Sequence, residues 1–263
     1  MRLWWEVARR GFRRYATYRW ATFAGVFTNT VFGFMRAYVL LALFRLTPQI
    51  NGYDASDALT YSFVTQGMLM PLYMWGWYEV SDTVYSGQIA TDLYRPFDYQ
   101  LYWLSLDMGR AVYHALMRGI PPFLVASVFF DLRLPVDVMT WPIFLVSFAL
   151  AVTVSFGMRF IVNLMSFWLV EVKGLNTLAS GVWTLLSGFI LPLAFFPDAI
   201  GRVLRMLPFA AMLELPMEIF LERAQGTEII GTLALQLMWA LVLLAAGRMV
   251  LASATRKLVV QGG

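Results

Sequence analysis

The feature that constrains this chain most is a series of long apolar segments with almost no charge. Residues 20–44 contain a single charged residue, Arg36, and residues 229–250 contain only Arg248. About 20 apolar residues in a helix are enough to cross the hydrocarbon core of a bilayer. Because 60% of the 263 residues are hydrophobic and 14% are charged, too few polar side chains remain to cover a water-soluble domain of this size. The sequence therefore predicts an integral membrane protein and argues against a soluble enzyme.

Six segments have the length and composition of membrane-spanning helices. We therefore expect an all-α integral membrane protein in which residues 1–263 form a single transmembrane domain. The third segment contains Arg118 and a Pro-Pro pair, so a start near Arg118 stays open. The predicted spans are residues 20–44, 58–78, 111–130, 141–169, 175–196 and 229–250.

The first 19 residues have the composition of an amphipathic helix that lies in the membrane interface. In a helix, Trp4, Trp5 and Phe12 fall on one face, with several arginines toward the other. A solvated basic tail is the alternative, but two adjacent tryptophans disfavour it. A cleaved signal peptide is also disfavoured, because no cleavage site formed by small residues stands out.

The distribution of basic residues predicts the orientation. With the N-terminus inside, the inner segments hold twelve basic residues and the outer loops hold five, which places both termini in the cytoplasm. The inner set is Arg2, Arg9, Arg10, Arg13, Arg14, Arg19, Arg95, Arg110, Lys173, Arg248, Arg256 and Lys257; the outer set is Arg45, Arg133, Arg202, Arg205 and Arg223.

Several kinds of chemistry are excluded by composition. The chain has no cysteine and one histidine, His114, so disulfides, thiolate catalysis and His-pair metal sites are not expected. Neither Lys173 nor Lys257 follows a glycine, so no phosphate-binding P-loop is present. All sixteen acidic residues fall in loops or at the ends of the predicted spans, which argues against a proton-coupled carrier. No catalytic residue, metal site, resident cofactor or nucleic-acid partner is predicted.

Polar residues recur on the first span. Gly25, Asn29 and Gly33 are spaced by four, a pattern that lets helices approach closely, and Arg36 lies on an adjoining strip. An arginine at the bilayer centre costs at least about 2.5–3.5 kcal/mol, so Arg36 is expected to face protein, water or the interface.

The fourth span carries a second polar stripe, formed by Ser155, Arg159 and Asn163. We take this stripe and Arg36, together with Asn29, as candidates to line an internal pathway cavity. For Arg159 the alternative is that its side chain extends to the inner interface.

The segment at residues 85–96 resembles the cytoplasmic gating segment of permeases in the type-2 family of ATP-binding-cassette (ABC) exporters. In those permeases a glycine and a leucine lead into an Arg-Pro pair after the second span. Here the pattern contains Gly87, Asp92, Arg95 and Pro96. The resemblance implies that residues 79–110 form a cytoplasmic segment that couples to an ATPase. An ordinary solvated loop is the alternative.

A second stretch resembles the end of span five and the re-entrant outer hairpin of the same family. It departs from the family pattern at Glu222-Arg223, where a small residue is expected. The hairpin would cover residues 197–228, and the residues that carry this resemblance are Gly188, Pro192, Pro197, Pro208 and Pro216.

Together these motifs are similar to the subgroup in which two permeases of about this chain's length work with one kind of ATPase. The resemblance implies an exporting permease in the plasma (inner) membrane of a prokaryote, and the aromatic and Met-rich spans favour an amphipathic, drug-like or lipid-like substrate. ATP and Mg would bind to a separate ATPase, present in two copies, and the second permease would be identical or homologous. A membrane-embedded lipid-modifying enzyme and a non-transporting assembly or sensor subunit are the alternatives.

Overall fold

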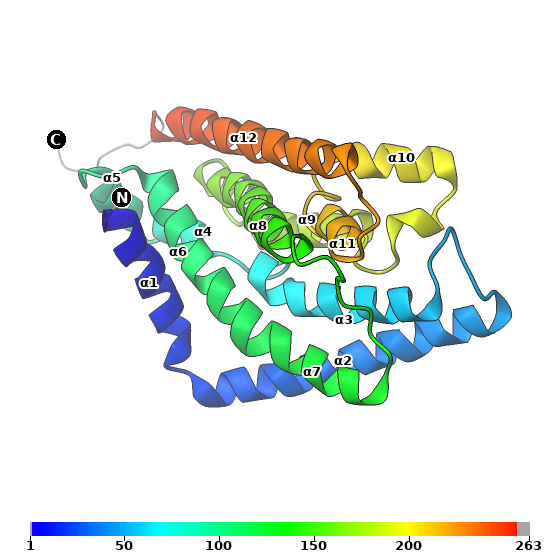
Figure 1. Ribbon diagram of the computed structural model, residues 1–263. Coiled ribbons are helices and arrows are strands. Elements are labelled where there is room, and N and C mark those ends of the chain that lie inside the picture. Colours follow the sequence, from blue (N-terminus) through cyan, green and yellow to red (C-terminus); the bar gives the residue numbers. More distant parts are fainter. Residues whose placement is uncertain (1, 257–263) are drawn as a thin grey trace.

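The computed structural model describes residues 2–256 and is built from helices (Figure 1). No β-strand occurs in this range, apart from one isolated bridge between Ile50 and Tyr53. Lys257, which belongs to the predicted inner charges, lies outside the described residues. The elements are α1 (Arg2–Ala16), α2 (Arg19–Leu46), α3 (Ala55–Leu72), α4 (Glu79–Tyr85), α5 (Gln88–Leu93), α6 (Tyr99–His114), η1 (Ala115–Gly119), α7 (Ile120–Phe129), α8 (Thr140–Leu164), η2 (Met165–Phe167), α9 (Lys173–Leu186), η3 (Leu193–Phe195), α10 (Asp198–Met206), α11 (Glu214–Phe220) and α12 (Thr227–Thr255).

Four helical segments are long and apolar enough to cross a membrane. They agree with the first, third, fourth and sixth predicted spans and support a multi-pass membrane protein. The other two predicted spans differ: α3 has 18 residues and is buried along most of its length, whereas α9 has only 14 residues. The six-span count therefore stays a prediction. The four segments are Trp20–Leu46, Tyr99–Phe129, Thr140–Phe167 and Thr227–Thr255.

The helix that contains the third predicted span begins at Tyr99 and not at Ala111. Its start is fixed by Asp98, whose carboxylate accepts a 2.8 Å hydrogen bond from the backbone N–H of Leu101. Asp107 consequently lies inside a candidate span, and the prediction that all acidic residues fall in loops or at span ends is wrong for it. A carboxylate is tolerated there because arginines from two helices neutralise it.

A single π-helical turn, η1, interrupts the same helix just before its Pro-Pro pair. Pro122 has no N–H, so the carbonyl of Arg118 lacks the donor that an α-helix would supply. The side chain of Asn29 on α2 replaces it, with a 3.2 Å hydrogen bond to the Arg118 oxygen. Asn29 therefore stabilises a defect in the neighbouring helix, and it is 6% exposed.

The small residues of α2 and α3 allow the close packing that their spacing predicts. A Cβ atom at Gly33 would lie 2.7 Å from the ring of Phe63 on α3, and one at Gly25 would overlap the guanidinium of Arg118. One turn further along α3, a Cβ atom at Gly67 would lie 3.1 Å from the backbone of Gly119. Helices α2 and α3 and the η1 turn thus pack together through contacts that larger side chains would prevent.

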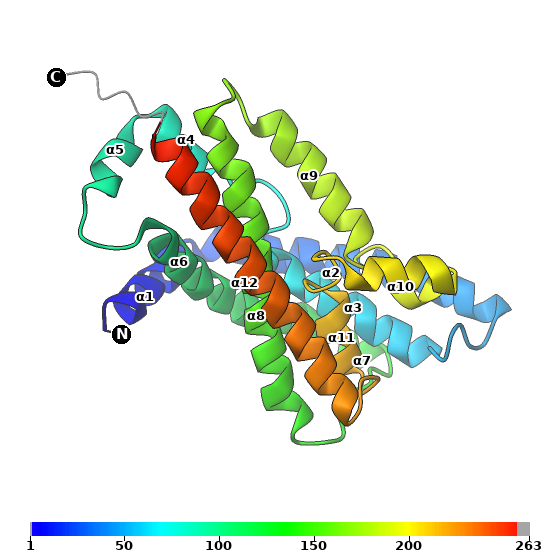
Figure 2. The same ribbon diagram turned by 90° about the horizontal axis from the view of Figure 1, so that it is seen from above.

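Helix α1 packs against α6 through another pair of glycines, and both views show the two helices side by side (Figures 1 and 2). A Cβ atom at Gly11 would lie 2.2 Å from the Leu106 oxygen, and one at Gly109 would lie 1.7 Å from the Ala8 oxygen. The helix predicted at the N-terminus is confirmed, while Trp5 points away from the bundle and is 70% exposed. Its position in a membrane interface stays a prediction.

We expect Gly109→Ala to displace α1 from α6, because the added methyl group would overlap a backbone oxygen that cannot move independently of α1. Limited trypsin digestion checks this: cleavage at the arginines of α1 should accelerate at least about tenfold, since local opening exposes the backbone. Gly181→Ala on α9 is the matched control, because a Cβ atom there meets nothing within 4 Å. Equal digestion of the two variants would contradict the close contact.

Helices α4 and α5 lie at one end of the bundle, together with the start of α1 and the end of α12 (Figure 2). Helix α10 and the connection between α2 and α3 lie toward the opposite end (Figure 1). The predicted coupling segment and the predicted outer hairpin are therefore separated by the length of the bundle.

Candidate functional site

The predicted coupling segment is a pair of short helices joined by a sharp turn. Gly87 forms the turn with φ of +74°, a left-handed conformation that favours glycine. Arg95 and Pro96 are exposed after the second helix, and the Arg95 guanidinium lies 3.6 Å from the Asp92 carboxylate. Because α6 begins at Tyr99, the segment between helices is shorter than the predicted range of residues 79–110.

Buried side chains anchor this helix pair. Val80 on α4 and Ile89 on α5 are 0% and 1% exposed and pack in one apolar cluster with Trp77 and Trp103. Asn163 on α8 adds polar contacts: its amide donates to the Trp77 oxygen at 3.0 Å, and its own oxygen accepts from the Ser81 N–H at 3.2 Å. The helix pair therefore presents a fixed tip, in contrast to a loosely held loop.

Next to this anchor lies a buried cluster of charges. The Asp107 carboxylate on α6 contacts the guanidinium of Arg159 on α8 at 2.6 Å and that of Arg110 at 2.8 Å. Arg159 is 1% exposed and Asp107 is 4% exposed. The Arg159 Nε atom also donates to the Ser155 hydroxyl at 3.2 Å, and Ser155 donates to the Leu72 oxygen.

Arg110 connects the cluster to the end of α3. Its guanidinium donates to the carbonyl oxygens of Met70 and Pro71 at 2.5 and 2.6 Å. These are among the last carbonyls of α3, at the helix end that favours a cation, and the Met70 oxygen also accepts a 3.1 Å hydrogen bond from the Tyr73 N–H. The ring of Tyr73, the left-handed residue that ends α3, lies 4.5 Å from the Arg110 guanidinium.

We call this set of side chains the polar clamp, because it holds the α3–α4 connection against α6 and α8. Each member is buried and hydrogen-bonded. The stripe predicted on α8 thus faces protein, and a role in a transport pathway stays a prediction. Sequence reasoning missed two members, although their i, i+3 spacing is the signal of a helical ion pair. The clamp consists of Asp107, Arg110, Ser155, Arg159 and Asn163.

Arg36 lies apart from the clamp. Its guanidinium donates to the Ser62 oxygen at 3.2 Å and to the Gln66 side chain at 3.3 Å, both on α3, and also to the Phe189 carbonyl oxygen. The same guanidinium lies 4.1 Å from the Phe189 ring. Within residues 2–256 no carboxylate pairs with it. Arg36 therefore links α2 to α3 and to the chain just beyond α9. Asn29 instead hydrogen-bonds to η1.

The break after α9 begins at Gly188, whose φ is +87°. The Tyr61 hydroxyl of α3 lies 2.8 Å from the Gly188 oxygen and 2.7 Å from the Glu214 carboxylate, and these two acceptors share its one proton. Proline residues begin or interrupt the short elements that follow, as their lack of an N–H requires. Pro192 precedes η3, Pro197 precedes α10, Pro208 lies between α10 and α11, and Pro216 lies in the first turn of α11.

The unexpected Glu222-Arg223 pair has a defined role at the tip of this hairpin. Glu222, with φ of +56°, accepts a 2.7 Å hydrogen bond from the Asp137 N–H before α8, which together with other hydrogen bonds lowers the pKa of Glu222. Arg223 pairs with the buried Asp57 at 3.1 Å and lies 3.5 Å from the ring centre of Tyr53. The two charges thus attach the hairpin to the adjacent loops.

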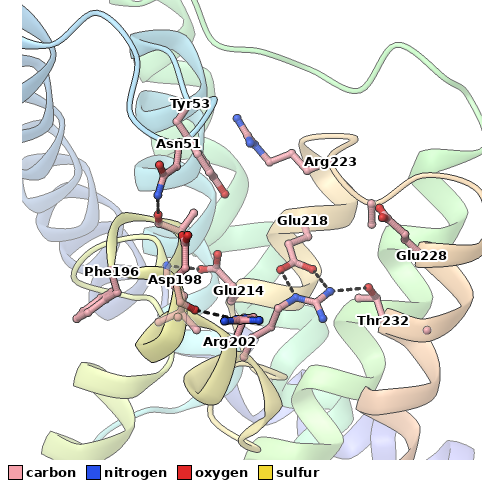
Figure 3. A pocket seen from close by; sticks show the side chains of 16 residues that line it. Asn51, Tyr53, Phe196, Asp198, Arg202, Glu214, Glu218, Arg223, Glu228 and Thr232 are labelled. Atoms are coloured by element: carbon pink, nitrogen blue, oxygen red, sulfur yellow. Dashed lines mark hydrogen bonds and ion pairs between the residues drawn. The ribbon is translucent and has the colours of Figure 1, made fainter.

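A wide pocket opens beside the hairpin (Figure 3). It has a volume of about 880 Å³ and lies between η3, α10, α11 and the first turns of α12. None of the five predicted pathway residues lines it. Sequence reasoning did not find this pocket: most of its walls belong to the hairpin and the start of α12, and Asn51 and Tyr53 are added by the connection between α2 and α3.

These features define a polytopic helical membrane protein with an anchored helix pair at one end and buried charges between its helices. A comparison with protein-family models matches residues 29–262 to the ABC-2 family transporter proteins, and the chain belongs to this family. The predicted relationship to type-2 ABC permeases is confirmed. A search of curated proteins gives no match. Membership makes the chain a transport component that is not itself catalytic and implies association with an ABC ATPase.

Proposed function

We propose that this chain is the permease subunit of an ABC exporter and that the α4–α5 helix pair is its docking element for the ATPase. Six membrane passes, counting α3 and α9, would place both termini and this helix pair in the cytoplasm. Two permeases, identical or homologous, would bind two ATPase copies that hold ATP and Mg. The membrane would be the inner membrane of a prokaryote.

The observation that carries the proposal is the link between the docking element and the bundle. An exposed turn at Gly87 would suit the groove of a partner, while Val80 and Ile89 bury the opposite side of the same two helices. The polar clamp then joins the start of α4 to α3, α6 and α8. A displacement of the docking element by ATP-driven closure would thus reach three helices as a rigid-body movement.

The substrate would be amphipathic, drug-like or lipid-like, and it would move outward. The spans contain many aromatic and methionine side chains, which accommodate irregular apolar molecules. The re-entrant form of the hairpin at residues 197–228 belongs to this proposal, as does its position on the outer side.

Reversal of charge on the docking element should uncouple the two subunits. Asp92→Arg together with Arg95→Glu is expected to lower ATP-dependent transport in inverted vesicles at least about tenfold. The reversed side chains would face like charges on the ATPase surface, which costs several kcal/mol. The spans should remain folded, since exposed ion pairs contribute about 0–1 kcal/mol. The measurement is transport together with co-purification of the ATPase.

The matched control is Asp131→Arg, which also reverses an exposed charge but lies outside the docking element. The Asp131 carboxylate makes no hydrogen bond or ion pair within the described chain. Its transport should equal that of the wild type. Wild-type ATP-dependent transport by the Asp92→Arg, Arg95→Glu variant would show that the ATPase does not bind at these residues. Failure of any ATPase to co-purify with the wild-type chain would count against the proposed function as a whole.

A further inference from the structure

The pocket beside the outer hairpin contains a buried carboxylate that is only half satisfied. Glu214 on α11 is 2% exposed and lines the pocket (Figure 3). Its Oε2 atom accepts hydrogen bonds from the Tyr61 hydroxyl at 2.7 Å and from the Leu193 N–H at 3.0 Å. No hydrogen bond or ion pair within residues 2–256 reaches its Oε1 atom. A buried carboxylate without a cation is costly, so this oxygen is available to a positively charged ligand.

The charges on the pocket walls favour a cation. Arg205 forms an ion pair with Glu218 at 2.6 Å. Arg223 forms an ion pair with Asp57, which lies outside the pocket. Asp198, Glu214 and Glu228 have no ion-pair partner in the described chain, and Arg202 is the one unpaired cation that faces them. The unpaired wall residues therefore carry more negative than positive charge.

The shape and the remaining wall select an organic cation over a metal ion. The volume of about 880 Å³ is that of a site for a drug-sized molecule. Leu193, Ala194 and Phe196 add an apolar wall beside the carboxylate. Among the described residues, no group of three or more acidic, histidine or cysteine side chains is arranged to hold a metal.

We infer that this pocket binds a hydrophobic organic cation, with Glu214 as the residue that contacts its positive charge. Because the pocket lies on the hairpin predicted to be external, it would serve as an exit-side site for a cationic substrate; this part rests on the proposed export function. Binding itself does not require export.

The inference is tested with ethidium, a permanently cationic aromatic probe, and the full-length chain in lipid nanodiscs. Binding is followed by the rise in ethidium fluorescence, without any ATPase. Glu214→Gln should raise the Kd at least about tenfold, since the positive charge of the probe would lose its buried counter-charge. Glu171→Gln, an exposed carboxylate outside the pocket, is the matched control and should leave the Kd unchanged.

Arg202→Gln gives an outcome that misfolding cannot imitate, because removal of the unpaired cation should tighten ethidium binding. Equal Kd values for Glu214→Gln and wild type, or weaker binding to Arg202→Gln, would overturn the inference. Displacement of ethidium by Ca²⁺ at constant ionic strength would also overturn it, by assigning the pocket to an inorganic cation.

The pH dependence in the wild type provides an independent readout. Burial raises the pKa of Glu214 to about 7, although hydrogen bonds from Leu193 and Tyr61 oppose the shift, Glu218 raises it and Arg205 lowers it. Protonation at low pH removes the negative charge, so ethidium binding should weaken from pH 8 to pH 5.5 and this change should vanish in Glu214→Gln. Retained pH dependence in that variant would contradict the role of Glu214. If ATPase co-purifies but ethidium does not bind, the inference fails alone; if ethidium binds and no ATPase associates, the proposed function fails alone.

Discussion

Asp107→Asn is expected to lower the stability of the folded protein by about 3–5 kcal/mol, the usual cost of removing one partner of a buried ion pair. The reason is that the Asp107 carboxylate forms two ion pairs at once, with Arg159 at 2.6 Å and with Arg110 at 2.8 Å. Loss of its charge leaves both guanidinium groups buried without a counter-ion. The measurement is thermal unfolding in detergent, scored as a rate of inactivation because membrane proteins of this kind unfold irreversibly.

Asp82→Asn is the matched control, since this carboxylate is exposed on α4 and forms no ion pair within residues 2–256. Its stability should equal that of the wild type. The double variant Asp107→Asn with Arg159→Met should recover part of the loss, because it removes one of the stranded charges. Unfolding of Asp107→Asn at the wild-type rate would show that the polar clamp contributes little.

The long apolar helices could be predicted from the sequence because lipid selects side chains locally. Helices α2, α8 and α12 follow their hydrophobic runs closely. The start of α6 could not be predicted in this way. Taken alone, Asp107 and Arg110 indicate a loop. They fit inside a membrane span only when the pairing of Asp107 with Arg159, some fifty positions later, is known. Hydropathy measures each side chain alone, whereas the cost of a buried charge depends on its partners.

The candidate sites also differ in whether they depend on local sequence or on partners from other parts of the chain. The turn at Gly87 is a local feature, so its conformation follows from the sequence and from the family resemblance. The stripe on α8 faces protein, and its partners Trp77 and Asp107 are contributed by the α3–α4 connection and by α6. The outer pocket also depends on tertiary structure, since its shape is set by how η3, α10, α11 and α12 pack and by Asn51 and Tyr53 from the α2–α3 connection.

Arg36 differs from the clamp because its charge has no carboxylate partner within the described residues. Two opposing effects decide what Arg36→Leu does to stability. Replacing a membrane-buried arginine relieves about 2.5–3.5 kcal/mol or more of desolvation. The same change leaves the acceptors of Gln66 and Phe189 without their donor, at about 1–3 kcal/mol each, whereas the Ser62 oxygen keeps the Thr65 hydroxyl. The effects are similar in size, so the unfolding rate should change little.

Transport should respond differently, because the Arg36 guanidinium contacts both α3 and the Phe189 oxygen just beyond α9. We expect Arg36→Leu to lower transport at least about tenfold, the range of a coupling free energy of about 1–3 kcal/mol between sites. Arg36→Lys should also fail, since one ammonium group cannot reach α3 and Phe189 together. Arg45→Leu, an exposed arginine on the same helix, is the matched control. Wild-type transport by Arg36→Leu would mean that the hairpin moves independently of α2, and the costly arginine would then have no functional reason to be there.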